Sequence, residues 1–307
     1  MQNSPMSRAI EVWSEFNLEQ SLEASFTLPF FDKIGDEYVK SYGRYRGLRI
    51  RQERNLLEFE GGSRLEAMML SGAWFNPHVE IRRINRNERN ILEKLLDVFP
   101  GLGIAINPWD KIATFYTVFL SRNTDYHSNT VKWVKRILRE AQDEEMIKSV
   151  NLSEVGKSYQ LRQLIEVRDR IDSLFSLGEF KKEKYELEDF LGLRTKMLSI
   201  KYCGPKVVHG WGLFTLGLTY LSQVDRHLLN IGRSLRIINP DDRNPEKALC
   251  ITSRCFLDRD CRILERCVTY KLYRLFGCMA GWFQTAAYLY GARYLSKGID
   301  PYSVVRK

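Results

Sequence analysis

The sequence lacks a long apolar run, a signal-peptide pattern and any repeated or low-complexity tract. Its most apolar stretch, Trp211 to Leu221, is shorter than the roughly 18 residues that a membrane-spanning helix requires. Residues 1–10 lack the charged start and apolar centre of a secretory signal. We therefore expect no membrane partner and a cytoplasmic location.

The composition favours an ordered globular protein with a basic C-terminal third. The 307 residues are 44% hydrophobic and 28% charged, which suits one large domain or two smaller ones. The formal net charge is +9, and residues 201–307 carry 17 basic but 8 acidic side chains. Charge concentrated in this way favours a polyanion such as nucleic acid as the partner, although solubility alone is the competing explanation.

Hydrophobic periodicity predicts a small antiparallel sheet followed by helices. Between Phe26 and Gly72, apolar Leu48 and Ile50 alternate with charged residues, and residues 60–63 offer a turn. From Arg89 onward apolar residues recur every three or four positions. The fold class predicted is α+β, mostly α.

Several helices have predicted bounds. Asn107 is expected to cap a helix that starts at Pro108 and ends near Arg122. Residues 128–138 and 161–175 have the amphipathic helical spacing, and the charged residues 181–189 are expected to form a solvated helical face.

A tight hairpin is expected between two helices at residues 202–205. Gly204 supplies the backbone freedom that such a turn needs, and Pro205 can open the second helix. Free N–H groups at a helix start bind phosphate well, so the hairpin is a candidate anion site.

Three segments carry a resemblance to a known family. Residues 204–206 (Gly-Pro-Lys) are followed by residues 224–227 (Val-Asp-Arg-His), which resembles the hairpin and aspartate of the helix-hairpin-helix (HhH-GPD) DNA glycosylase superfamily. Residues 107–123 resemble its Asp-Pro-aromatic-Glu helix and Ser-x-Asn turn. Residues 279–288 are similar to the Ala-Gly-Trp-Ala-Gln helix of the 8-oxoguanine DNA glycosylases.

The resemblance implies a fold and a division of the chain. It implies an N-terminal antiparallel β domain with flanking helices over residues 1–100 and helical glycosylase domains over residues 101–307. The hairpin would span about residues 198–212, and a base-pocket helix about residues 279–296. It also implies a nucleoid-associated monomer that binds double-stranded DNA containing a damaged base.

The implied activity is that of a bifunctional DNA glycosylase/AP lyase in base excision repair. Lys206 would attack the sugar C1′ and form a Schiff base, and the Asp225 carboxylate would stabilise positive charge on the sugar. The alternatives are that Asp225 is an ordinary helix N-cap and that Lys206 contacts a phosphate.

The base pocket is assigned to the C-terminal helix. Gln284 would read the edge of the extruded base and Tyr288 would stack on it, and one helical turn separates them. The competing interpretation is that Gln284 is solvated and Tyr288 lies in the core.

Five residues are expected to contact DNA. Asn123 would fill the gap left by the extruded base, with Arg122 facing the opposite strand. Gly204 and Val208 would donate backbone N–H groups to phosphate, and His227 would contact a phosphate beside the lesion. The alternatives are a turn residue at Asn123 and a structural histidine at His227.

The sequence departs from the family pattern in three places. Tyr202 stands where the first hairpin glycine is usual, and the Gly-Gln-x-Phe-Arg-Trp segment that recognises 8-oxoguanine is absent. The cysteine spacing also differs from the family's Cys-x6-Cys-x2-Cys-x5-Cys loop, which follows the last helix. In this chain the cysteines precede residues 279–288, and Cys261 and Cys267 fall in a run, Phe256 to Phe276, that is expected to be helical.

We therefore expect no metal and no cofactor. The alternative is a [4Fe–4S] cluster on four cysteines, Cys250, Cys255, Cys261 and Cys267.

The substrate expected is an oxidised purine, 8-oxoguanine in particular. The alternatives are a glycosylase for an oxidised pyrimidine or a deaminated base, and a catalytically silent DNA-binding protein.

Overall fold

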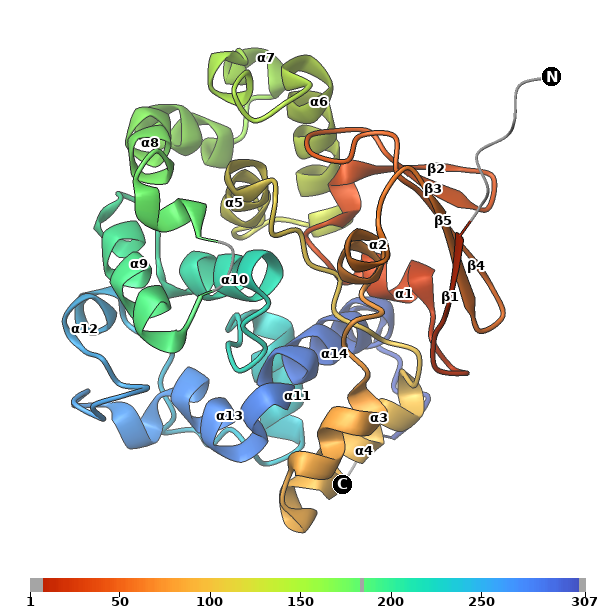
Figure 1. The fold of residues 1–307 in the computed structure, drawn as a ribbon. Helices are drawn as coiled ribbons and strands as arrows, with labels where there is room; N and C mark the ends of the chain where they lie inside the picture. Colours follow the sequence, from red (N-terminus) through yellow and green to blue (C-terminus); the bar gives the residue numbers. More distant parts are fainter. Residues whose placement is uncertain (1–7, 183–184, 304–307) are drawn as a thin grey trace. The chain divides into compact units, whose positions relative to one another are not determined.

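The computed structural model describes residues 8–182 and 185–303, which form two compact units (Figure 1). Unit 1 is Met1–Asn76 with Gly101–Asp169, and unit 2 is Pro77–Pro100 with Arg170–Lys307. The predicted boundary at residue 100 does not match this division, because each unit takes two separate stretches of the chain. No helix among the described residues is long and apolar enough to cross a membrane.

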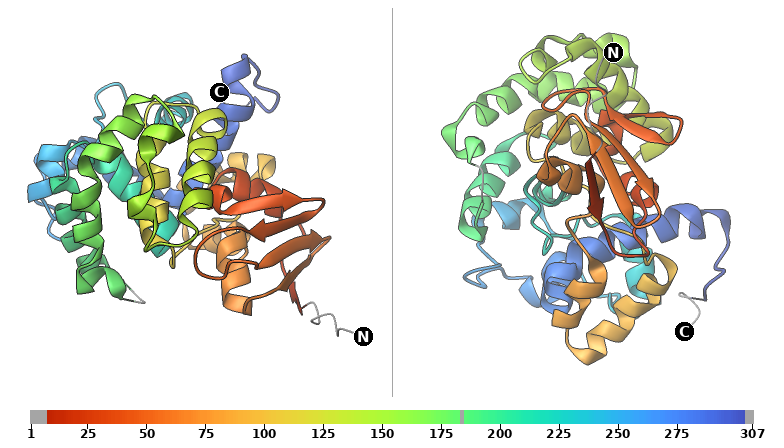
Figure 2. Two further views of the ribbon diagram at one scale, coloured as in Figure 1. Left: turned by 90° about the horizontal axis from the view of Figure 1, so that it is seen from above. Right: turned by 45° about the vertical axis from the view of Figure 1, so that its right-hand side comes forward.

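Unit 1 contains a five-stranded antiparallel sheet in the order β1-β5-β4-β3-β2, whose strands lie side by side in Figure 2. The strands are β1 (Arg8–Glu11), β2 (Phe31–Ile34), β3 (Glu37–Lys40), β4 (Arg49–Glu53) and β5 (Leu56–Glu60). Buried Ile50 pairs with buried Phe59, as the alternating pattern predicts. The strand β1, which completes the sheet beside β5, was not predicted from the sequence.

The helices of unit 1 begin after the sheet and resume after residue 100. They are α1 (Leu18–Glu23), α2 (Arg64–Ser71), α5 (Lys111–Leu120), α6 (Val131–Ala141) and α7 (Leu152–Val155), with short turns at Leu28–Phe30, Tyr126–Thr130 and Ile147–Ser149. Helix α8 (Tyr159–Phe175) contains the division between the units. The turn predicted at residues 60–63 leads from the strand β5 into the helix α2.

The start of α5 differs from the prediction. Asp110, and not Asn107, is the N-cap residue of α5. The Asn107 side chain accepts hydrogen bonds from the Trp109 and Asp110 N–H groups, so it stabilises the turn that precedes the helix. The helix ends at Leu120, close to the predicted end.

A buried ion pair stands beside the start of α5. Lys40 Nζ lies 2.6 Å from Asp110 Oδ2, and both side chains are almost completely buried. The Lys40 ammonium also donates to the carbonyls of Tyr42 and Arg44. Because every donor of the ammonium has an acceptor, the desolvation cost of this buried charge is largely offset.

Glu144 is hydrogen-bonded to the start of the same helix, α5. Its Oε1 accepts hydrogen bonds from the Ile112 and Ala113 N–H groups, at 2.6 and 3.4 Å. Burial, together with the negative charge of Asp110, raises the pKa of Glu144 to about 8. Glu144 is therefore largely protonated at neutral pH in the folded protein.

This raised pKa predicts that stability falls as the pH rises from about 4.5 to about 8, because the folded protein then holds a proton that the unfolded chain has released. We expect Glu144→Gln, which keeps the acceptor and cannot ionise, to flatten this dependence. Urea unfolding at several pH values would measure it, with the exposed Glu140→Gln as the control. An unchanged slope in Glu144→Gln would assign the pH dependence to other groups.

Unit 2 consists of helices joined by irregular segments, and its described residues include none of the five strands. Its helices are α3 (Pro77–Glu80), α4 (Arg86–Val98), α9 (Leu187–Ser199), α10 (Pro205–Leu216), α11 (Arg226–Ser234), α12 (Lys247–Thr252), α13 (Val268–Phe276) and α14 (Ala280–Arg293), with short turns at Ile81–Arg83, Gly178–Lys181, Leu264–Arg266, Gly277–Met279 and Leu295–Lys297. Of the charged residues 181–189, only those from Leu187 onward are in α9, and residues 183–184 lie outside the described part.

Helix α14 is the buried centre of unit 2. It packs against α11, α13 and α4, and it is apolar on nearly every face. The Gly281 N–H donates to the Thr219 carbonyl at 2.7 Å, and a Cβ at Gly281 would lie 2.7 Å from the Leu213 side chain. Only glycine therefore allows α14 to approach α10 and the segment that follows it.

Candidate active site

The hairpin between α9 and α10 has the predicted place but a different backbone. Helix α9 ends at Ser199, the carbonyl of the next residue, Ile200, accepts from the Cys203 N–H at 3.2 Å, and α10 begins at Pro205. The left-handed residue is Tyr202, with φ +63°, whereas Gly204 has an ordinary φ of −110°. The prediction that Gly204 supplies the unusual backbone shape is therefore wrong, and Tyr202 takes that shape in place of the usual glycine.

Gly204 is open to its surroundings. A Cβ at this position would meet no other atom within 4 Å. Neither the backbone angle nor the packing of the chain requires glycine here, so the space beside the Gly204 backbone is accessible to an external group.

Lys206 lies in the first turn of α10 and is half-buried. The neighbouring Val208 N–H donates to the Gly204 carbonyl at 3.2 Å. Because this N–H is part of the helix, Gly204 is better placed than Val208 as the predicted backbone donor to phosphate.

Asp225 is the N-cap of α11. Its Oδ1 accepts from the Leu228 N–H at 2.8 Å, and the side chain is half-buried. The N-cap interpretation is thus confirmed, and it is compatible with catalysis because the carboxylate keeps a second oxygen and gains from the helix dipole.

His227 connects α11 to α14. A Cβ on Gly291 would lie 2.2 Å from His227 Nδ1, so the imidazole packs directly on that glycine. The ring also meets Tyr288 edge-on, with 5.6 Å between ring centroids. The structure thus gives His227 a packing role, and contact with a phosphate stays a prediction.

The two pocket residues differ in exposure. Gln284 is 4% exposed, and its Oε1 is buried without a hydrogen-bond partner among the described residues. Tyr288 is half-buried. The alternatives of a solvated Gln284 and a core Tyr288 therefore both fail. A buried acceptor without a partner is costly unless a ligand supplies the donor.

Arg122 and Asn123 follow α5 in unit 1. Arg122 Nη2 donates to Gln163 Oε1 at 2.8 Å, and the guanidinium lies 3.7 Å from the centre of the Phe119 ring. Asn123 is exposed with φ +48°, a conformation that asparagine tolerates. Asn123 therefore projects from a left-handed turn, while Arg122 is held against its own unit.

A buried arginine and histidine were missed by the sequence analysis. Arg194 of α9 is 1% exposed, although it occupies the position expected of an apolar residue between Leu191 and Leu198. A charged residue on the apolar face of a predicted helix is the signal by which the sequence could have identified Arg194. Burial, together with the Arg194 charge, lowers the pKa of His209 to about 3, so this imidazole is neutral.

Comparison with known proteins identifies the fold. No protein-family model matches this sequence, and no curated protein sequence does. Solved structures do match over nearly the whole chain. MBOgg1 in complex with a low-affinity DNA ligand has a TM-score of 0.66 and 13% identity, and the match covers 95% of this chain and 97% of that one.

Two further solved structures are similar. The Clostridium acetobutylicum 8-oxoguanine glycosylase/lyase, bound to double-stranded DNA with cytosine opposite 8-oxoguanine, has a TM-score of 0.64 and 12% identity, covering 94% and 98% of the two chains. The Archaeoglobus fulgidus 3-methyladenine DNA glycosylase has a TM-score of 0.59 and 13% identity, covering 92% and 98%. Together with the hairpin, the Asp225 cap and the buried C-terminal helix, these matches show that the chain has the α+β fold of the helix-hairpin-helix DNA glycosylases.

Proposed function

We propose that this protein is a DNA glycosylase with AP lyase activity that excises an oxidised purine, 8-oxoguanine in particular, from duplex DNA. The observation that carries the proposal is the arrangement in unit 2. Lys206 lies in the first turn of the helix after the hairpin, Asp225 caps α11, and α11 packs through His227 on the helix that carries Gln284 and Tyr288. Phosphate binding alone would need neither the lysine nor the aspartate at these positions.

The proposed reaction begins with extrusion of the damaged nucleotide, at a cost of a few kcal/mol that contacts with DNA offset. The Lys206 Nζ lone pair then forms a bond to C1′ while the bond from C1′ to the base breaks. The base leaves with that electron pair and is protonated. Asp225 stabilises the positive charge that develops on the sugar.

The lyase step follows from the same covalent bond. The sugar ring opens to give a Schiff base between Nζ and C1′. Loss of a proton from C2′ then expels the 3′ phosphate and breaks the strand, and water releases the lysine. These steps require no cofactor, and we propose that the protein acts as a monomer on double-stranded DNA.

Borohydride trapping tests the proposal, because it reduces the Schiff base to a stable amine. We would compare duplexes that contain 8-oxoguanine, thymine glycol, uracil or an abasic site. A trapped complex with 8-oxoguanine supports both the chemistry and the lesion. Trapping of only the abasic duplex would retain the lyase and reject the lesion, trapping with thymine glycol or uracil would name another substrate, and no trapping at all would favour a silent DNA-binding protein.

Because the space beside Gly204 is open, we expect the variant Gly204→Ser to lose DNA affinity without losing stability. Serine is a good N-cap and fits the φ of −110°, so Gly204→Ser should fold as well as the parent chain. Its hydroxymethyl group would occupy the space that a phosphate needs, and we expect duplex affinity to fall about tenfold. Gly178→Ser, also in open space, is the matched control for the binding titration. Unchanged affinity in Gly204→Ser would remove the hairpin from the interface.

The buried Gln284 acceptor predicts a variant that loses excision of the damaged base but keeps cleavage at an abasic site. Gln284→Ala removes a group that would pair with the extruded base, so excision of 8-oxoguanine should fall by about 10- to 100-fold. Cleavage of an abasic duplex, which has no base to read, should change far less. Single-turnover rates on both duplexes measure the difference, and equal losses would place Gln284 outside the pocket.

A further inference from the structure

Two buried glutamines of unit 2 each have an amide atom without a hydrogen-bond partner among the described residues. Gln284 of α14 is 4% exposed, and its Oε1 is an unpaired acceptor. Gln223, in the segment between α10 and α11, is 2% exposed, and its Nε2 is an unpaired donor. Such atoms are uncommon, because a buried polar group without a partner loses its hydration and gains nothing in return. The two amides suit a ligand that offers one acceptor and one donor.

The segment between α10 and α11 lies against the first turn of α14. The Gly281 N–H of α14 donates to the Thr219 carbonyl at 2.7 Å. A Cβ at Gly281 would also lie 3.0 Å from the Leu221 carbonyl oxygen. Two residues of the segment are therefore in contact with the start of α14, and Gln223 follows them closely in the chain.

The segment leads into a second contact farther along α14. His227 of α11 packs on Gly291, and α14 rises about 15 Å between this contact and the one in its first turn. Residues 221–225, which contain neither helix nor turn, run between the two contacts. Gln223 is at the middle of this stretch, so it lies beside the part of α14 that carries Gln284.

The conformation of the segment relates Gln223 to Asp225. The Asp225 backbone is extended, with φ −127° and ψ 179°. In an extended segment, side chains two positions apart point to the same side, which favours one side for Gln223 and Asp225. The unpaired Nε2 is thus associated with the carboxylate that faces the sugar in the proposed reaction, and the base attached to that sugar is the ligand it suits.

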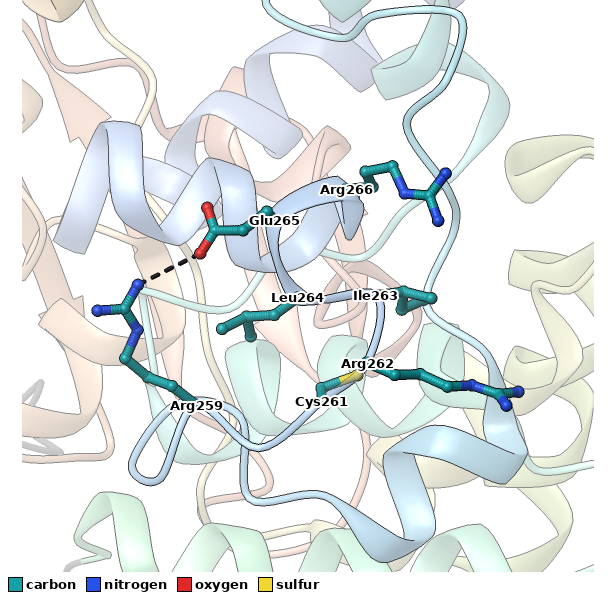
Figure 3. A pocket seen from close by; sticks show the side chains of 7 residues that line it. All are labelled: Arg259, Cys261, Arg262, Ile263, Leu264, Glu265 and Arg266. Atoms are coloured by element: carbon teal, nitrogen blue, oxygen red, sulfur yellow. Dashed lines mark hydrogen bonds and ion pairs between the residues drawn. The ribbon is translucent and has the colours of Figure 1, made fainter.

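The hollow in Figure 3 is a different site. It measures about 410 Å³ and is lined by residues of the segment between α12 and α13, among them Arg262 and Arg266, and by neither glutamine. Both arginines are exposed, whereas a pocket for a base is mostly apolar and contains few polar groups. The two unpaired amides, and not this hollow, indicate where a base binds.

We propose that Gln223 is a second specificity-determining residue, which donates a hydrogen bond from Nε2 to a carbonyl oxygen of the extruded base while Gln284 Oε1 accepts from the adjacent ring N–H. This inference rests on the proposed function and deepens it. The edge of 8-oxoguanine has a carbonyl oxygen beside a ring N–H, whereas 8-oxoadenine has an amino group beside a bare ring nitrogen. With 8-oxoadenine, two donors would meet at Gln223 and two acceptors at Gln284, so the pocket rejects that base.

Gln223→Met separates recognition from stability. Methionine is unbranched and of similar length to glutamine, but it has no amide. The substitution removes an unpaired buried donor, so the melting temperature of the free protein should not fall. A purely structural glutamine would behave in the opposite way, because its replacement would lower the melting temperature and leave the base preference unchanged. Gln20→Met in α1 of unit 1 also removes an amide with an unpaired buried atom, and it is the matched control.

The test is the affinity of the parent chain and both variants for duplexes that contain 8-oxoguanine or 8-oxoadenine. A 2′-fluoro group on the sugar of each lesion destabilises positive charge there, so the base stays attached during the titration. We expect the parent chain and Gln20→Met to prefer 8-oxoguanine by about 100-fold, and Gln223→Met by less than about tenfold. The change should come from weaker binding of 8-oxoguanine, with no loss of affinity for 8-oxoadenine.

Two results would overturn the proposal. One is a Gln223→Met chain that keeps the parent preference, and the other is a parent chain that binds 8-oxoadenine as tightly as 8-oxoguanine. If Gln223→Met does not fold, Gln223→Glu decides the question, since it keeps the shape of the side chain and exchanges the donor for an acceptor.

Failure of the proposed function gives a different result. Duplexes with hypoxanthine or uracil, which also have a carbonyl beside a ring N–H, are titrated in parallel. If the parent chain prefers one of these and Gln223→Met loses that preference, Gln223 reads the base and only the assigned lesion is wrong. If the parent chain prefers none of the four bases, the proposal for Gln223 is wrong, and borohydride trapping on the abasic duplex reports separately whether the lyase is present.

Discussion

Lys206→Gln is expected to abolish borohydride trapping on every duplex and to reduce strand cleavage by at least about three orders of magnitude. Glutamine has no amine to form the bond to C1′, so the covalent route is lost rather than slowed. The substitution removes one charge at a half-buried position in the first turn of α10. Duplex affinity should therefore stay within about threefold to fivefold of the parent value.

A matched lysine stands five residues earlier in the same hairpin. Lys201 is exposed, and its Nζ lies 4.7 Å from the centre of the Tyr202 ring. Lys201→Gln removes the same charge from the same region and should trap normally. If Lys206→Gln still traps, or if it loses affinity while it continues to cleave, Lys206 is a phosphate contact and the nucleophile lies elsewhere.

Asp225→Asn is expected to separate catalysis from stability. Asparagine caps a helix as well as aspartate does, so the hydrogen bond to the Leu228 N–H should survive. The free energy of unfolding should change by less than about 1 kcal/mol, most of it from the lost charge at the helix N-terminus. Base excision should fall by about 10²- to 10⁴-fold, because a neutral amide does not stabilise a cationic sugar.

Asp225→Ala provides the complementary variant. It removes both the cap and the charge, so it should lose about 1 kcal/mol of stability in addition to the catalytic defect. Urea unfolding and single-turnover excision, measured on both variants, distinguish the two roles. An Asp225→Asn protein that excises the base at the parent rate would show that Asp225 is a helix cap and nothing more.

The two catalytic candidates owe their positions to local structure that sequence spacing can reveal. A helix that begins at Pro205 places Lys206 in its first turn, and an aspartate before an amphipathic run caps that run. These features depend on neighbouring residues, so the predicted elements appear in the structure within a few residues. The pocket pair one turn apart on α14 has the same origin.

Backbone conformation in the hairpin was harder to predict. The presence of glycine suggested that Gly204 would take the unusual angles, yet Tyr202 adopts the left-handed conformation. The free energy by which a left-handed position favours glycine is small. The packing of the two helices on either side of the turn can therefore hold another residue in that conformation. Of the helical run expected from Phe256 to Phe276, the α-helix begins only at Val268, because a helical period in apolar residues does not distinguish a helix from a buried irregular loop.

By itself the sequence determined the fold class, the hairpin, the capped α11 and the residue types available for chemistry, because these follow from spacing and local preference. Only the tertiary structure decided the interleaved division into two units, the burial of Gln284 Oε1 without a partner among the described residues, the packing of His227 on Gly291 and the burial of Arg194 beside Cys255. Each of these joins segments far apart in the chain, and such contacts are selected by the burial of apolar surface and the pairing of buried polar groups over the whole fold.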